Sequence, residues 1–126
     1  MISIDADVLI NFLTGNDVNK IEKLFRRIES RKKKILLTQQ VILEIIYTLE
    51  YNYKWDRENI FNVVNIIIND PLFKVEEKED ILKALNLYKK TSIPFFDVLK
   101  IMKEDVDQII SYNRSFEEAG IKVIMP

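Results

Sequence analysis

The sequence predicts an α/β fold, a three-layer α/β/α sandwich around a central, mostly parallel sheet. Short β-branched runs alternate with amphipathic helical segments along the whole 126-residue chain, a pattern typical of parallel strands joined by helices. The chain has only two Gly and three Pro, so most of it is expected to be regular structure. Because no linker, repeat or low-complexity segment interrupts the pattern, we predict a single domain over residues 1–126.

In the first half of the chain, apolar spacing of i, i+3, i+4 and i+7 predicts helices, and short β-branched runs predict strands. Asp17 and Thr38 directly precede the second and third helices, and we expect their side chains to cap them. The expected elements, in order, are a strand at 2–4, a helix at 8–13, a helix from 18 to about 30, a strand at 35–37 and a helix from about 39 to 53.

In the second half, Asp56 is expected to cap a helix that Asp70 and Pro71 end. Pro94 is expected at the first position of a later helix. The remaining elements are a brief strand at 72–75, a helix from 77 to about 90, a helix from 94 to about 104, a strand at 107–111, a loop or short helix at 113–119 and a strand at 121–124.

The composition restricts the chemistry, because the chain has no Cys and no His. It therefore lacks a thiol nucleophile, an imidazole base, disulfides and zinc sites of the usual Cys/His kind. Carboxylates, amines, hydroxyls and hard metal ions bound through oxygen remain available. Carboxylate ligands suit Mg²⁺ or Mn²⁺.

The net charge of −1 argues against a strongly basic nucleic-acid binder, although it permits a local basic face. No segment has the roughly 18 apolar residues that a membrane-spanning helix needs. The opening residues also lack the basic region of a signal peptide. We therefore expect a cytoplasmic protein that does not bind a membrane.

Three acidic residues are not explained simply as solvated surface. Asp5 ends the first strand, and ligands of parallel α/β sheets bind at the carboxyl ends of strands; it equally fits a helix N-cap. Glu44 has only apolar neighbours in sequence, so if buried it must be paired, metal-bound or at a cleft edge; it equally fits an exposed stripe on an otherwise buried helix. Asp97 lies in the first turn of a helix, where an acid favours the dipole.

Three carboxylates from separate elements, in a chain without His or Cys, would form a site for a hard cation. Mg²⁺ or Mn²⁺ held in this way typically acts on phosphates, because the ion activates water and neutralises charge on the phosphate oxygens. Repulsion among the carboxylates would be relieved by the ion, so binding would also stabilise the fold.

Four segments, in order along the chain, resemble PIN-domain nucleases. They are IDADVLI at 4–10, VILEI at 41–45, FFDVL at 95–99 and IISYNRSF at 109–116, and the closing strand at 121–126 also fits that family. The resemblance covers essentially the whole chain. It is similar in particular to single-domain VapC-type toxins, the ribonuclease half of toxin–antitoxin pairs.

This resemblance implies a Mg²⁺- or Mn²⁺-dependent endoribonuclease that forms a homodimer and is inhibited by a small VapB-like antitoxin. By the same resemblance, Asp5, Glu44 and Asp97 take the acidic metal-binding positions of the catalytic site. Asn113 falls where many members carry a further Asp and would assist by orienting water. Ser111 would place a hydroxyl near the metal or the phosphate.

Several positions depart from the family pattern. Asn113 removes one negative charge, Pro94 replaces a common acid, and Ala6 replaces a hydroxyl, while Asp7 stands in place of the usual Asn. These departures leave open an alternative, a degenerate PIN domain that binds RNA or a protein partner without efficient cleavage. A generic phosphate-binding module is a third hypothesis, but the chain lacks any glycine-rich phosphate loop.

A basic run lies between residues 20 and 34, where eight Lys or Arg and two Glu give a net charge of +6. Its members could attract RNA phosphates or form a solvated helix end; the candidates are Arg26, Arg27, Arg31, Lys32, Lys33 and Lys34. Tyr51, Tyr53 and Trp55 either stack on bases or make core or partner contacts.

Overall fold

The computed structural model describes all 126 residues. They form two compact units, residues 1–78 and 79–126. Each unit contains its own set of parallel strands and its own helices. The α/β class predicted from the sequence is confirmed, because every strand pair is parallel and helices connect the strands.

The first unit is built on a three-stranded parallel sheet of β1 (Ile2–Ser3), β2 (Ile35–Leu37) and β3 (Phe73–Val75), in the order β1-β2-β3. Ile35 pairs with Ile2 on one side and with Phe73 on the other. Ile35, Leu37 and Phe73 are buried, whereas Ser3 and Lys74 are exposed. This alternation follows from the two-residue period of a strand.

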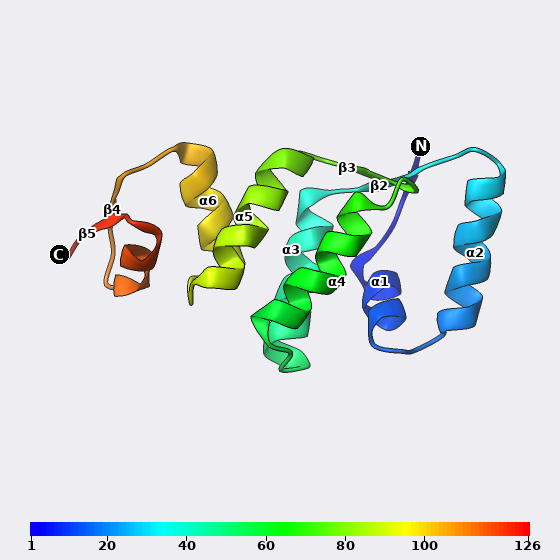
Figure 1. Cartoon of the computed structure of the whole chain (residues 1–126), viewed down its shortest axis with the longest axis horizontal. Coiled ribbons are helices and arrows are strands. Elements are labelled where there is room, and N and C mark those ends of the chain that lie inside the picture. Colours follow the sequence, from blue (N-terminus) through cyan, green and yellow to red (C-terminus); the bar gives the residue numbers. More distant parts are fainter. The chain divides into compact units, whose positions relative to one another are not determined.

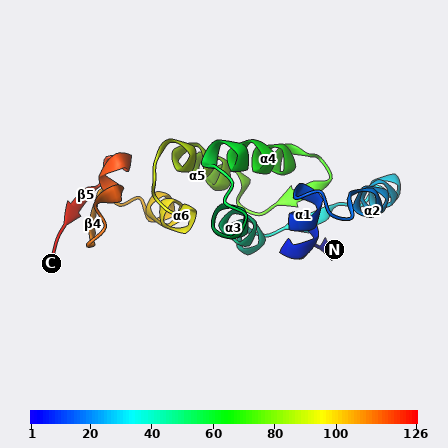
Figure 2. The same ribbon diagram turned by 90° about the horizontal axis from the view of Figure 1, so that it is seen from below.

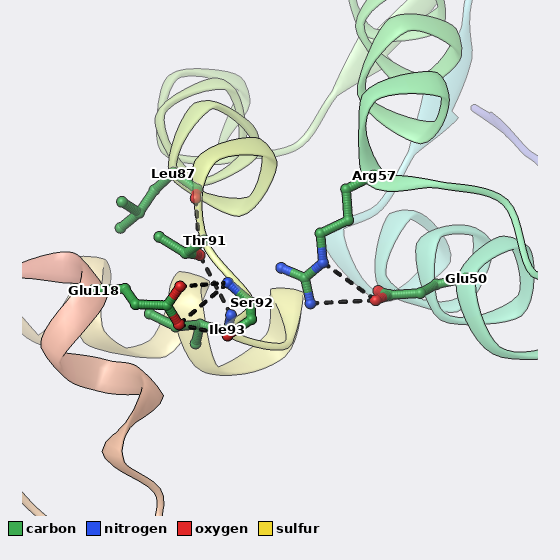
Figure 3. Close-up of polar contacts among 7 residues, drawn as sticks. All are labelled: Glu50, Arg57, Leu87, Thr91, Ser92, Ile93 and Glu118. Atoms are coloured by element: carbon green, nitrogen blue, oxygen red, sulfur yellow. Dashed lines mark hydrogen bonds and ion pairs between the residues drawn. The ribbon is translucent and has the colours of Figure 1, made fainter.

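The first unit also contains five helical segments: α1 (Ala6–Leu13), α2 (Val18–Ser30), α3 (Gln39–Tyr47), the π-helical turn η1 (Thr48–Asn52) and α4 (Arg57–Asn69). Figures 1 and 2 show α3 beside α4, and α1 between α3 and α2. An ion pair between Arg57 and Glu50, with nitrogen and oxygen 3.2 Å apart, joins α4 to η1 (Figure 3).

The caps of these helices test the sequence predictions directly. Thr38 Oγ1 accepts from the Val41 N–H at 3.3 Å, and Asp56 Oδ1 accepts from the Asn59 N–H at 2.8 Å, so both predicted caps are confirmed. The predicted Asp17 cap is wrong. Asp17 precedes α2 with a left-handed backbone (φ 53°) and makes no capping hydrogen bond, because this conformation differs from the extended one that N-cap residues usually adopt.

Helix α2 ends in a Schellman motif, with a lysine at the position that usually holds glycine. The Lys33 N–H donates to the Ile28 carbonyl at 3.3 Å, and the Lys32 N–H donates to the Glu29 carbonyl at 2.9 Å. Lys32 has a φ of 56°. A left-handed residue with a Cβ costs roughly 1 kcal/mol relative to glycine.

The second unit contains α5 (Lys78–Lys90, which begins at the last residue of the first unit), α6 (Phe95–Glu104), β4 (Gln108–Ile110), the 3₁₀ helix η2 (Arg114–Ala119) and β5 (Lys122–Ile124). Strands β4 and β5 pair in parallel. The rings of Tyr88 and Phe95 meet edge to face at 5.7 Å, between α5 and α6. Pro94 is the N-cap of α6 rather than its first residue, so the helix begins one residue later than predicted.

No helix in the structure has the length and apolar character needed to cross a lipid bilayer.

Candidate functional site

The carboxyl edge of the three-stranded sheet carries a polar residue after each strand. Asp5 follows β1, Thr38 follows β2 and Glu76 follows β3. Because the three strands are parallel, their carboxyl ends lie at one edge of the sheet, where ligands of α/β sheets usually bind. The structure thus places Asp5 where a site is expected.

Asp5 fits both hypotheses that the sequence left open. Its carboxylate is exposed, and Oδ1 accepts from the Ala6 N–H at 2.9 Å as the N-cap of α1. That bond fixes the carboxylate at the helix start and engages one of its oxygens. A carboxylate has about four acceptor positions, so capping does not prevent it from binding a cation.

Glu76 is a residue at this edge that our sequence analysis did not select. Its Oε1 accepts from the Gln39 N–H at 3.3 Å, at the start of α3. The Glu76 N–H in turn donates to the Leu37 carbonyl at 3.0 Å. The signal was present, since the rule that selects Asp5 after the first strand also selects Glu76 after the strand predicted at 72–75.

Glu44 lies on α3, and its side chain is exposed. The apolar residues Ile42, Ile45 and Ile46 are buried, which confirms an exposed stripe on an otherwise buried helix. Helix α3 packs against α1, the helix that Asp5 caps. The elements that carry Asp5 and Glu44 are therefore in contact within the first unit.

The exposed stripe continues past Glu44 as a pair of aromatic rings. Tyr47 and Tyr51 are 62% and 41% exposed, and their ring centroids lie 4.7 Å apart. Tyr53 is also exposed, while Trp55 is half-buried. Tyr51 and Tyr53 are therefore exposed rather than part of the buried core, which is compatible with base stacking or partner contact.

Asp97 lies in the first turn of α6 in the second unit, as predicted, and is half-buried. Its neighbours Phe95, Val98 and Leu99 are buried, and they anchor the turn that carries the carboxylate. An acid at this place favours the helix dipole.

Ser111 and Asn113 are brought together in the turn that follows β4. The Asn113 N–H donates to Ser111 Oγ at 2.9 Å, and Asn113 Oδ1 accepts from the Ser115 N–H at 2.9 Å as the N-cap of η2. Both side chains therefore have a local structural role, and their orientation is fixed by these bonds.

Glu118 ties η2 to the turn before α6 within the second unit (Figure 3). Its carboxylate accepts from the Ser92 N–H at 3.3 Å and from the Ser92 hydroxyl. Behind this contact, the buried Thr91 donates its hydroxyl to the Leu87 carbonyl at 3.0 Å and accepts from the Ile93 N–H at 3.3 Å. These bonds connect the segment of Asn113 to the helix of Asp97.

The donor set of the predicted site suits a hard divalent cation. Asp5, Glu44 and Asp97 offer only carboxylate oxygens, the ligands that Mg²⁺ and Mn²⁺ prefer. Within its own unit, none of the three is paired with a lysine or arginine, so no cationic side chain competes with a metal ion. Neither unit by itself brings three acidic side chains close enough to share an ion. The ligand set of Asp5, Glu44 and Asp97 draws on both units and stays a prediction.

The predicted RNA-binding lysines lie at the other edge of the first unit's sheet. Lys33 and Lys34 lie directly before β2, at the amino edge, whereas Asp5 follows β1 at the carboxyl edge. Arg26 and Arg27 are exposed on α2, and Arg27 lines a cleft of about 290 Å³ between α1 and α2. The structure therefore does not bring Lys33 and Lys34 to Asp5.

The fold and these residues define a class of protein. Its members are parallel α/β chains with acidic residues at strand ends and helix starts, and here without Cys or His. The PIN domain family matches residues 2–122 of the chain. A protein of Aquifex aeolicus (strain VF5) named VapC ribonuclease is 38% identical over 128 aligned residues, covering 98% of this chain and 95% of the relative. No solved structure matches significantly. The chain belongs to the PIN-domain family.

Proposed function

We propose that this protein is a metal-dependent endoribonuclease, the toxin of a VapBC-type toxin–antitoxin pair. The observation that carries the proposal is the similarity to the Aquifex VapC ribonuclease, which extends over nearly the full length of both chains. The family match spans both compact units, and we propose that they act together as one PIN domain.

In this proposal Asp5, Glu44 and Asp97 would hold Mg²⁺ or Mn²⁺ through carboxylate oxygens. When bound, such an ion activates water and offsets charge on the phosphate oxygens. In the hydrolysis the water oxygen would bond to phosphorus while a bridging P–O bond breaks, and the proton lost by the water would end on the leaving oxygen, which gives one phosphate end and one hydroxyl end. Asn113, whose amide oxygen is fixed by the Ser115 N–H, orients the water, and the neighbouring Ser111 contacts the phosphate.

The test is cleavage of single-stranded RNA by purified protein with Mn²⁺, Mg²⁺ or EDTA, compared with Asp5→Asn. We expect metal-dependent cleavage that Asp5→Asn removes. Asp56→Asn is the matched control, because Asp56 is also an exposed N-cap and Asn caps a helix as well as Asp does. Equal cleavage by wild type and Asp5→Asn would refute the proposed role of Asp5.

The alternative function is a PIN domain that binds RNA or a protein partner without efficient cleavage. Asn113 favours it, because an amide stands where many members have an acid, and its oxygen already caps η2. Calorimetry distinguishes the two: Mn²⁺ binding at micromolar to millimolar concentration supports the nuclease, and its absence supports the binding domain. An Asn113→Asp variant that cleaves faster than wild type would identify the missing charge as the cause of weak activity.

The proposed partners follow from the same similarity. They are RNA as substrate, a small VapB-like antitoxin as inhibitor and a second copy of the chain as a homodimer, all in the cytoplasm. Light scattering of the purified chain tests the dimer. Co-purification with the product of a small neighbouring reading frame tests the antitoxin.

A further inference from the structure

Four lysines gather at the amino edge of the three-stranded sheet in the first unit. This basic edge, as we name it, consists of Lys32, Lys33, Lys34 and Lys74, and all four side chains are exposed. They line two clefts of about 340 and 330 Å³ that share Lys33 and Lys34. Lys74 comes to the first cleft from β3, whose pairing with β2 brings it near residues some forty positions earlier in the chain.

The charge of the basic edge is strongly one-sided. Lys33, Lys34 and Lys74 line the first cleft with no acid, and Glu29 is the single acid that lines the second. Four lysines and one glutamate give a net charge of +3, in a chain whose total charge is −1. None of the four lysines forms an ion pair in the structure.

The remaining lining of the clefts is mostly apolar. Met1 and Ile2 contribute to the first cleft, and Pro71 and Leu72 contribute to the second. Lysine stems lie along such surface while their ammonium groups stay in water. The arrangement presents a row of point charges to an anionic ligand that spans both clefts.

Lys32 adds an independent observation. It occupies the left-handed position of the Schellman motif that ends α2, where glycine is the favoured residue. A lysine at this position brings its charge to the second cleft despite an unfavourable backbone conformation.

We propose that the basic edge is an exosite for the backbone of single-stranded RNA, separate from the acidic residues at the carboxyl edge. The proposal rests on the proposed RNA substrate. The two edges are separated by strands of two or three residues, a length of roughly 10 Å. Lysine contacts to phosphate carry no sequence information, so the exosite increases affinity for long RNA and leaves cleavage specificity to the other edge.

The first test is binding in EDTA, where metal-dependent hydrolysis does not occur. Fluorescence anisotropy of a labelled 24-nucleotide RNA compares wild type with a triple variant, Lys33→Ala, Lys34→Ala and Lys74→Ala. We expect about tenfold weaker binding at low salt, and a slope of log K against log salt that is smaller by about 2, or roughly 0.7 for each lysine lost. The control, Lys78→Ala, Lys83→Ala and Lys90→Ala, removes the same charge from exposed positions on α5.

Lys32→Gly provides a variant in which folding and binding are expected to change in opposite directions. Glycine relieves the left-handed backbone, so the melting temperature should rise while RNA affinity falls about two- to threefold with the loss of one charge. A fall in affinity with a rise in stability cannot result from unfolding.

The cleavage assay distinguishes an exosite from a cleavage-site contact. The triple variant should raise KM for the 24-nucleotide RNA several-fold and leave kcat/KM unchanged for a dinucleotide, which is too short to reach both edges. Three results would each overturn the exosite. The first is equal impairment of cleavage on both RNAs, and the second is unchanged RNA affinity and salt slope. The third is binding to polyglutamate that is tighter than binding to RNA and that the triple variant abolishes. If wild type cleaves no RNA, the proposed function fails, and the EDTA binding result still decides the basic edge.

Discussion

The two edges of the first unit's sheet differ in how their polar side chains are held. At the carboxyl edge, Asp5, Thr38 and Glu76 each accept a hydrogen bond from a backbone N–H. At the amino edge, none of the four lysines forms an ion pair. Groups held by hydrogen bonds suit the positioning of a reaction, whereas exposed, unpaired cations suit affinity for a polyanion. We interpret the first edge as part of the chemical site and the second as a surface for RNA.

The largest expected effect comes from breaking the sheet that holds both edges. Leu37, the last residue of β2, is fully buried, so Leu37→Ala should lower the free energy of unfolding by about 2–5 kcal/mol. Urea denaturation measures the change. An ordinary surface substitution changes stability by no more than about 0.5 kcal/mol. If Leu37→Ala stayed within that range, the burial of Leu37 in the sheet that holds both edges would be refuted.

Glu44→Gln separates chemistry from folding. Glu44 is exposed, so stability should stay within about 0.5 kcal/mol of wild type. RNA cleavage should fall by more than about 100-fold, because even residues that only orient metal ligands change activity 10–100-fold. Glu58→Gln, at an exposed position on α4, is the control; an equal loss in both variants would contradict a specific role for Glu44.

Glu76→Ala tests whether the carboxyl edge depends on the bond that our sequence analysis missed. Losing the contact to the Gln39 N–H should cost about 0.5–1.5 kcal/mol of stability. Cleavage should fall further than the stability loss explains, because the contact fixes the start of the helix that carries Glu44. Parallel denaturation and cleavage measurements compare the two, and unchanged cleavage would make Glu76 a purely structural residue.

The smallest expected effect is at the amino edge. Lys32→Gly should stabilise the protein by about 0.5–1 kcal/mol, because glycine adopts the left-handed conformation without a Cβ penalty. Thermal and urea unfolding measure the gain. A loss of stability would show that the lysine side chain makes a stabilising contact that outweighs its backbone cost.

The sequence predicted much of the fold because its signals are local. Helix starts at Thr38 and Asp56 follow from side chains that bond to a backbone N–H three residues later. Asp17 failed the same rule, since its backbone is left-handed, a conformation that Asp adopts more readily than most residues. The helix predicted to run to Tyr53 instead widens into η1, where the Tyr53 N–H donates to the Thr48 carbonyl five residues earlier.

The candidate residues divide in the same way. Asp5 and Asp97 were found because a strand end and a helix start can be identified from neighbouring residues. Lys74 was missed because it joins Lys33 and Lys34 only through the pairing of β3 with β2. Pairing between distant strands cannot be predicted from the residues of either segment alone. The basic edge could therefore be recognised only in the structure.

The proposed chemistry depends on a single metal site held by Asp5, Glu44 and Asp97. Anomalous scattering from crystals soaked in Mn²⁺ tests it most directly. We expect a peak about 2.1 Å from carboxylate oxygens of all three residues, the distance typical of small divalent cations. A peak on other acids, or none at millimolar Mn²⁺, would contradict it.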